Sequence, residues 1–125
     1  MFKITSDKTI HLTRGDVANI FIGAALDGEG EHTFSVGDIV RFRIVQKKDY
    51  SNVVRQKDVV VNIETSTVTI SLTKEDTKIG EIINKPVDYW YEVELNPDTD
   101  PHTLIGHDET GAKIFRLYPE GSDLV

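Results

Sequence analysis

The sequence predicts an all-β protein, an antiparallel β-sandwich of about eight strands with one short helix. Three observations lead to this prediction. Val, Ile and Thr, which favour strands, supply 38 of the 125 residues, whereas Ala and Leu, which favour helices, supply only 11. Short runs of strand-forming residues recur between turn signals. Several of these runs also alternate apolar with polar side chains, as strands with one buried face do.

The expected strands follow one another along the chain and are separated by residues that favour turns. Turn signals containing Gly, Pro, Asn or Asp stand at 14–16, 27–30, 36–38, 96–98 and 109–111. Many short strands with frequent turns are typical of a sandwich. The strands expected from the runs between these signals are Phe2–Ile4, Thr9–Thr13, Val17–Ala25, Val40–Gln46, Val53–Ile63, Thr67–Leu72, Val87–Leu95, Thr103–Gly106 and Lys113–Tyr118.

One short helix is predicted at Lys74–Ile79. The hydroxyl of Thr73 can cap its first turn, which also carries Glu75 and Asp76, acidic residues that suit the positive end of a helix. Gly80 can adopt the left-handed conformation that ends a helix. The segment has room for only one or two turns.

Length and composition indicate one domain and disfavour several classes of function. No repeat or break in composition appears, so residues 1–119 are assigned to one sandwich and residues 120–125 to a polar tail. The net charge of −7 and the lack of a cluster of four basic residues disfavour nucleic-acid binding. The chain shows no signal peptide and no apolar run of ten residues, so neither export by a visible signal nor a membrane span is expected. Zero Cys excludes disulfides and thiolate metal sites.

The clearest alternation lies in the expected strand 87–95. Val87, Tyr89, Tyr91, Val93 and Leu95 share one face, which we expect to be buried in the core. The opposite face then carries the only Trp of the protein among carboxylates: Asp88, Trp90, Glu92 and Glu94.

The strand 40–46 shows a similar division. Arg41 and Arg43 are expected on its outer face, opposite an apolar inner face. If this strand lies beside 87–95, the two arginines can form cross-strand pairs with Glu92 and Glu94. Together with Trp90, these four residues form a candidate interface.

Metal binding and catalysis are not indicated. Oxygen and imidazole groups gather in 96–102 and 107–109, in a pattern that resembles the start of a calcium loop. However, Pro101 stands where that loop needs Gly, and His107 stands where it needs Glu. No nucleophile elbow or paired-carboxylate motif appears, so we expect neither an enzyme nor a cofactor.

Two other motifs have a structural and a functional interpretation. Arg14-Gly15-Asp16 is a tripeptide of some adhesion ligands, but it also fits a tight turn with Gly15 at positive φ, which we prefer. Trp90 is the basis of the alternative function, carbohydrate binding by ring stacking. With Tyr89 and Tyr91 directed inward, however, Trp90 is expected to stand alone, which is more typical of a protein interface.

The order of the motifs resembles a known family. The pieces that carry the resemblance are Leu12-Thr13-Arg14-Gly15-Asp16-Val17, Val36-Gly37-Asp38-Ile39-Val40-Arg41-Phe42, Leu72-Thr73-Lys74-Glu75-Asp76-Thr77, and Tyr89-Trp90-Tyr91-Glu92-Val93-Glu94-Leu95 leading to Thr103-Leu104-Ile105-Gly106. In this order they resemble the N-terminal domain of phage upper baseplate proteins and related prophage tail proteins of Gram-positive bacteria. The resemblance spans roughly Ile4 to Tyr118.

The resemblance implies an immunoglobulin-like sandwich that serves as a structural or adaptor part of a phage tail baseplate. Such a protein acts through contacts with other tail proteins, without catalysis, and, where the assembly is symmetric, through contacts between copies of itself. The expected location is the virion, and the host cytoplasm during assembly. Family members usually continue into a stalk or further domains, which sets this sequence apart, since it stops just after the last expected strand.

Overall fold

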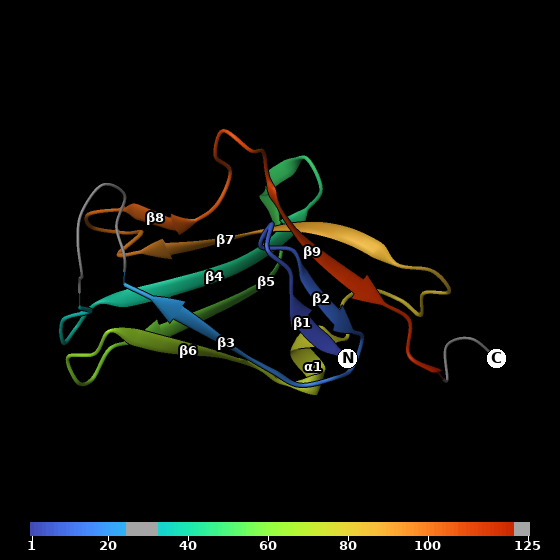
Figure 1. Ribbon diagram of the computed structural model, residues 1–125, viewed down its shortest axis with the longest axis horizontal. Coiled ribbons are helices and arrows are strands. Elements are labelled where there is room, and N and C mark those ends of the chain that lie inside the picture. The colour runs from blue at the N-terminus through green and yellow to red at the C-terminus, as the bar shows by residue number, and fades with distance from the viewer. Residues whose placement is uncertain (25–32, 122–125) are drawn as a thin grey trace.

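The computed structural model describes residues 1–24 and 33–121 (Figure 1). Within these residues the chain forms strands and one short helix. The elements in order are β1 (Phe2–Ile4), β2 (Ile10–Thr13), β3 (Ala18–Gly23), β4 (Ile39–Gln46), β5 (Asp49–Val60), β6 (Thr67–Leu72), α1 (Lys74–Thr77), β7 (Val87–Leu95), β8 (His102–Ile105) and β9 (Lys113–Tyr118).

The strands form an all-β sandwich of two sheets of unequal size. The large sheet has the order β1-β2-β9-β7-β4-β5, with β8 also paired to β7, and the small sheet consists of β3 and β6 (Figure 1). The fully antiparallel arrangement expected from the sequence is wrong for one pair, because β2 and β9 run parallel. No hairpin dictates the direction of this pair, since almost the whole chain lies between its two strands.

Strand β7 lies at the centre of the large sheet and pairs with three others. Along one edge, Trp90–Leu95 pairs with β4. Along the other edge, Val87–Tyr91 pairs with β9 and Val93–Leu95 pairs with β8. The chain leaves this edge between β8 and β9 and turns back through a small hairpin closed by a bridge between Asp108 and Gly111.

The core lies between the two sheets and follows the alternation read from the sequence. In β3 and β6 every second residue is buried, and the inner faces of β4 and β7 are buried in the same way. The largest fully buried side chains are Phe34, Phe42, Phe115, Ile10, Leu12, Ile22, Ile44, Ile70, Leu117, Val40, Val45 and Val93. The expected inward position of Tyr89 and Tyr91 is confirmed.

Strand β5 differs from its expected bounds at both ends. It begins at Asp49, four residues before the expected Val53, because a tight turn at Lys47 and Lys48 joins it directly to β4. Lys48 adopts a positive φ of 67° in this turn. Asp49–Asn52 has few residues that favour strands, so pairing with β4 overrides local propensity there.

The helix α1 is also shorter than expected. The hydroxyl of Thr73 accepts from the backbone N–H of Asp76, whose carboxylate accepts from the Thr73 N–H, so the expected cap is confirmed as a capping box. The helix ends at Thr77 because Lys78 has a non-helical ψ of 61°, and Gly80 follows at positive φ. Ile79 leaves the helix and is buried in the core.

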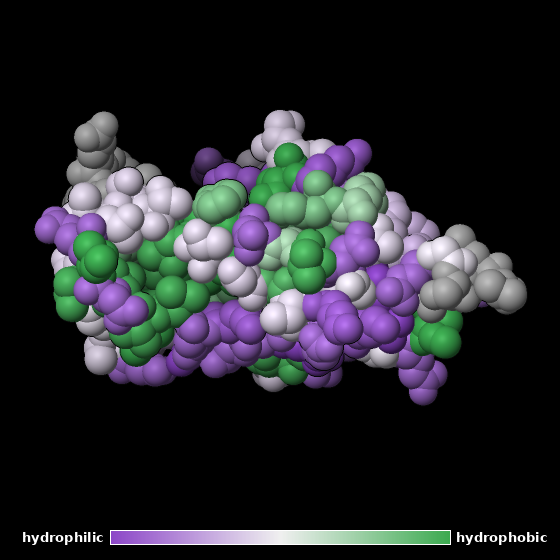
Figure 2. Space-filling view, turned by 90° about the horizontal axis from the view of Figure 1, so that it is seen from below, coloured by the Kyte–Doolittle hydropathy of each residue, from purple (hydrophilic) through white to green (hydrophobic). Residues whose placement is uncertain are grey.

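The side that carries β3, β6 and α1 is mixed in polarity. Figure 2 views the molecule from this side and shows apolar residues most densely gathered left of the middle, with hydrophilic residues along the lower edge and towards the right. Phe21 on β3 is 69% exposed. The acidic turn expected at 27–30 lies outside the described residues, and of the tail at 120–125 only Glu120 and Gly121 are described.

Phe42→Ala is expected to lower the free energy of unfolding by about 3–5 kcal/mol, because Phe42 is fully buried on β4, beside the central strand β7. Phe21→Ala removes the same kind of side chain from an exposed position and is expected to change the free energy of unfolding by less than about 0.5 kcal/mol. Denaturant unfolding followed by Trp90 emission measures both. Equal losses in the two variants would contradict the assignment of the core.

Candidate functional site

The outer face of the large sheet carries rows of arginines and carboxylates. The expectation that β4 lies beside β7 is confirmed, because Arg41 is paired in register with Glu94, and Arg43 with Glu92. We call the outward side chains of β4, β5, β7 and β9, with the loop groups that contact them, the outer face. The candidate interface residues Trp90, Glu92, Glu94, Arg41 and Arg43 all belong to it.

Arg41 binds two carboxylates, neither of which is its register partner Glu94. Its Nε and Nη2 donate to the two oxygens of Asp58 on β5 at 3.0 Å each. Its Nη1 and Nη2 donate to Asp98, in the turn after β7, at 3.3 and 3.1 Å. The pKa of Arg41 lies above its usual value, mainly because of the hydrogen bonds to Asp58 and, to a smaller extent, because of those to Asp98. The expected pairing with Glu94 is replaced because both nitrogens of one guanidinium edge reach Asp58 together.

Arg43 makes the cross-strand pairs that the sequence suggested. Its Nη2 donates to Glu92 and lies 3.7 Å from Glu94. The pKa of Glu94 is raised mainly by burial and, to a smaller extent, by the neighbouring charge of Glu92. The Nε of Arg43 is buried and has no hydrogen-bond partner among the described residues.

A third arginine extends the face towards β9. Arg116 donates from Nε and Nη2 to the two oxygens of Asp88 at 2.7 and 3.1 Å. The hydrogen bond to Arg116 is the largest cause of the lowered pKa of Asp88. Beside this pair, His11 on β2 lies 2.8 Å from the Tyr118 hydroxyl, and burial lowers the pKa of His11. The pair of Arg116 with Asp88 was not predicted, because nothing in the sequence indicated that β9 lies beside β7.

Trp90 does not stand alone as expected. Its ring lies 5.3 Å from that of Tyr50 and 6.0 Å from that of His107, with the His107 ring edge-on. The ring centroids of Tyr50 and His107 are 6.5 Å apart, so the three rings form one half-exposed cluster. The hydroxyl of Tyr50 is buried without a hydrogen-bond partner in the part of the chain that the structure describes. Nothing in the local sequence of Trp90 indicates its two neighbours, since both come from distant segments.

The remaining candidate residues fall elsewhere. Gly15 adopts a φ of 88°, which confirms the turn interpretation, and Arg14 is buried with its Nη2 donating to the carbonyl of Gly80 at 3.0 Å. His102 lies 3.4 Å from Asp100 in an exposed position. Over residues 1–24 and 33–121, no three His, Cys, Asp or Glu side chains are placed to hold a metal ion.

Comparison with family models, with curated proteins and with solved structures finds no match to this chain. Among the residues that the structure describes, no helix combines the length and apolar character that a membrane crossing requires.

Asp88→Asn is expected to lower the free energy of unfolding by about 1 kcal/mol near neutral pH. The pKa of Asp88 is lower in the folded chain than its value of about 3.9 in the unfolded chain. The pair with Arg116 therefore stabilises the fold fully above that unfolded pKa, and the stabilisation is lost as the pH falls through the folded pKa of Asp88. Unfolding measured from neutral to acid pH checks this: the difference from the natural chain should shrink on acidification. Glu109→Gln, at an exposed hairpin position, is the control, and a difference independent of pH would contradict the assignment.

Proposed function

We propose that this chain is a structural or adaptor protein of a phage or prophage tail baseplate, which binds other tail proteins through its outer face. The ordered motifs from Leu12 to Gly106 support the family, and a single β-sandwich suits a part that is held by contacts on its surface. The observation that carries the proposal is the aromatic cluster of Trp90, Tyr50 and His107 among ion-paired arginines. Trp, Tyr and Arg are the residues that protein interfaces concentrate.

Each of the three arginines of the outer face already has a carboxylate partner before another protein covers it. Arg41 binds two carboxylates, Arg43 lies between two others, and Arg116 is paired with Asp88. A buried charge without a partner is strongly destabilising, whereas these groups keep their partners when water is excluded. The face therefore offers aromatic area at its centre and hydrogen-bonded charges around it, which is the usual anatomy of an interface.

The proposed partners are other baseplate proteins, and copies of this chain where the assembly is symmetric, since a symmetric array uses the same patch on every subunit. The proposed location is the virion, reached through assembly in the host cytoplasm. In this function the chain holds its neighbours in place and performs no reaction.

Trp90→Ala is expected to abolish co-elution of this chain with a tail protein encoded beside its gene, because it removes the centre of the aromatic cluster. The two chains are co-expressed and separated by size-exclusion chromatography with light scattering, which also reports self-association. Phe21→Ala, an aromatic truncation on the exposed face of the small sheet, is the control and should leave the complex intact. A complex that survives Trp90→Ala, or a chain that stays monomeric and binds no tail protein, would contradict the proposal.

Carbohydrate binding at Trp90 is a second candidate, which the cluster itself favours. Sugar rings stack on aromatic faces, and the structure adds Tyr50 and His107 to the single ring expected from the sequence. Quenching or a shift of Trp90 emission by a glycan would support this function. A change in emission that persists in Tyr50→Ala would argue against stacking by the cluster.

A further inference from the structure

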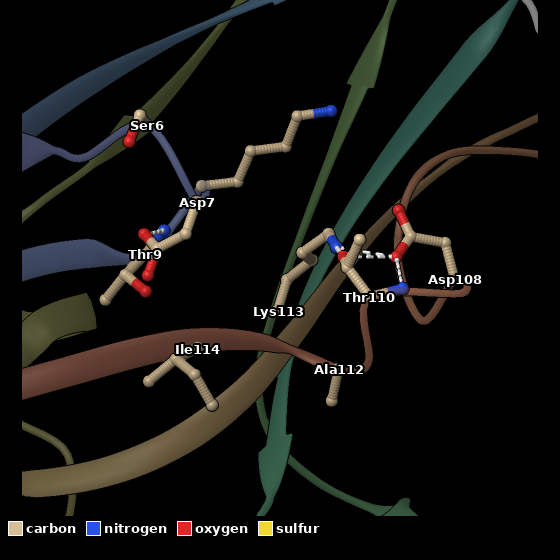
Figure 3. Close-up of a pocket in the computed structure, with 9 residues that line it drawn as sticks. Ser6, Asp7, Thr9, Asp108, Thr110, Ala112, Lys113 and Ile114 are labelled. Atoms are coloured by element: carbon tan, nitrogen blue, oxygen red, sulfur yellow. Dashed lines mark hydrogen bonds and ion pairs between the residues drawn. The ribbon is translucent and has the colours of Figure 1, made fainter.

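A polar cleft lies beside the outer face, where the turn between β1 and β2 approaches the hairpin between β8 and β9. Figure 3 shows Ser6, Asp7 and Thr9 on one side and the hydrogen-bonded group of Asp108, Thr110 and Lys113 on the other. The cleft has a volume of about 400 Å³, which falls within the range of small-ligand sites. Its lining residues are Ser6, Asp7, Lys8, Thr9, Asp108, Thr110, Ala112, Lys113 and Ile114.

Both walls of the cleft are fixed by their own hydrogen bonds. In the first wall, Oδ1 of Asp7 accepts from the Thr5 hydroxyl at 2.7 Å and from the Thr9 N–H at 3.0 Å. In the second, Oδ1 of Asp108 accepts from the Thr110 N–H at 2.9 Å and from its hydroxyl at 2.6 Å. A carboxylate offers about four acceptor positions, so both groups retain acceptors for a ligand.

The charges of the cleft disfavour an ionic ligand of either sign. Lys113 is 95% buried, and its ammonium group donates to Asp108, to Thr110 and to the carbonyl of Gly111 at 2.9, 2.8 and 3.5 Å. Its three protons are thus in use, and the two carboxylates repel an anion. A cation would meet the charges of Lys113 and Lys8. A neutral ligand with many hydrogen-bonding groups fits this balance of charges.

The lining also matches one kind of neutral ligand. The Ser6 hydroxyl can donate and accept, and the Thr110 hydroxyl, whose proton is donated to Asp108, keeps one acceptor position. The ionised carboxylates accept from hydroxyl groups, and Ala112 and Ile114 offer an apolar surface. Hydrogen bonds of Asp7 to Thr5 and Thr9 lower the pKa of its carboxyl to about 2, so this group is an acceptor at neutral pH. Dense hydroxyl groups around an apolar ring face are the chemistry of a sugar.

The cleft continues towards the aromatic cluster. A second hollow of about 150 Å³ shares Lys8, Asp108 and Lys113 with it and is also lined by His107. The ring of His107 contacts Trp90, and Ile114 of the cleft is the register partner of Trp90. A chain of sugars that fills the cleft can therefore extend towards these rings.

We propose that the cleft between the 5–9 turn and the 106–113 hairpin is a binding site for a neutral saccharide unit. This site adjoins the outer face and shares Ile114 with it, but its argument does not rest on the protein contacts proposed there. It deepens the second candidate function, because it places the hydrogen-bonding part of sugar recognition beside the aromatic cluster.

The test is an NMR titration of the ¹⁵N-labelled chain with glucose, galactose, rhamnose and N-acetylglucosamine and with short neutral oligomers of each. We expect at least one of these sugars to shift the amide signals of residues 6–9 and 108–114. Calcium chloride, inorganic phosphate and a neutral alanine tripeptide serve as probes of the excluded chemistries. Shifts of these amides with any of the three probes and with none of the sugars would overturn the proposal, as would silence throughout the sugar series.

Ala112→Trp fills the cleft without removing any of the hydrogen bonds of its walls, and it should reduce sugar affinity at least tenfold. Thr69→Trp, at an exposed position on the small sheet, is the matched control and should bind as the natural chain does. If Ala112→Trp loses its dispersed spectrum, Ser6→Ala provides a milder variant that should weaken binding. Binding that is abolished by Trp90→Ala and unchanged by Ala112→Trp and Ser6→Ala would place the sugar on the rings and contradict the cleft.

Discussion

The alternation of side chains along β7 is the constraint on which both the core and the outer face depend. Tyr89, Tyr91 and Val93 point into the core, while Trp90 and Glu92 point outward. Because β7 is held in register by β4 on one edge and by β8 and β9 on the other, a slip of one residue would exchange the two faces. Such a slip would bury carboxylates and expose tyrosines, which fixes the register strongly.

The same central strand explains why the candidate sites lie where they do. Since β7 changes partner from β9 to β8 along one edge, the chain between those strands must leave the sheet, and its hairpin forms one wall of the polar cleft. The excursion also brings His107 against Trp90. The aromatic cluster and the cleft are therefore two consequences of one change of pairing.

Features that depend on local sequence were predicted well. The bounds of β6, β7 and β9 agree with the runs of alternating residues, and the cap of Thr73 follows from its neighbours. Features that depend on contacts between distant segments were not predicted from the sequence. The parallel pairing of β2 with β9 and the packing of Tyr50 against Trp90 join segments that share no local pattern. The burial of Lys113 was not predicted either, although its partners lie within five residues of it. Burial of a lysine becomes understandable only when Asp108 and Thr110 are seen to bind its ammonium group.

Amide hydrogen exchange measured by NMR tests the central role of β7 most directly. The amides of β7 and β4 that pair within the sheet should be the slowest of the chain and should exchange only through global unfolding. Those of the edge strand β1 should exchange faster through local opening. Exchange in β7 as fast as in β1 would show that β7 does not hold the two faces in place and would contradict this account.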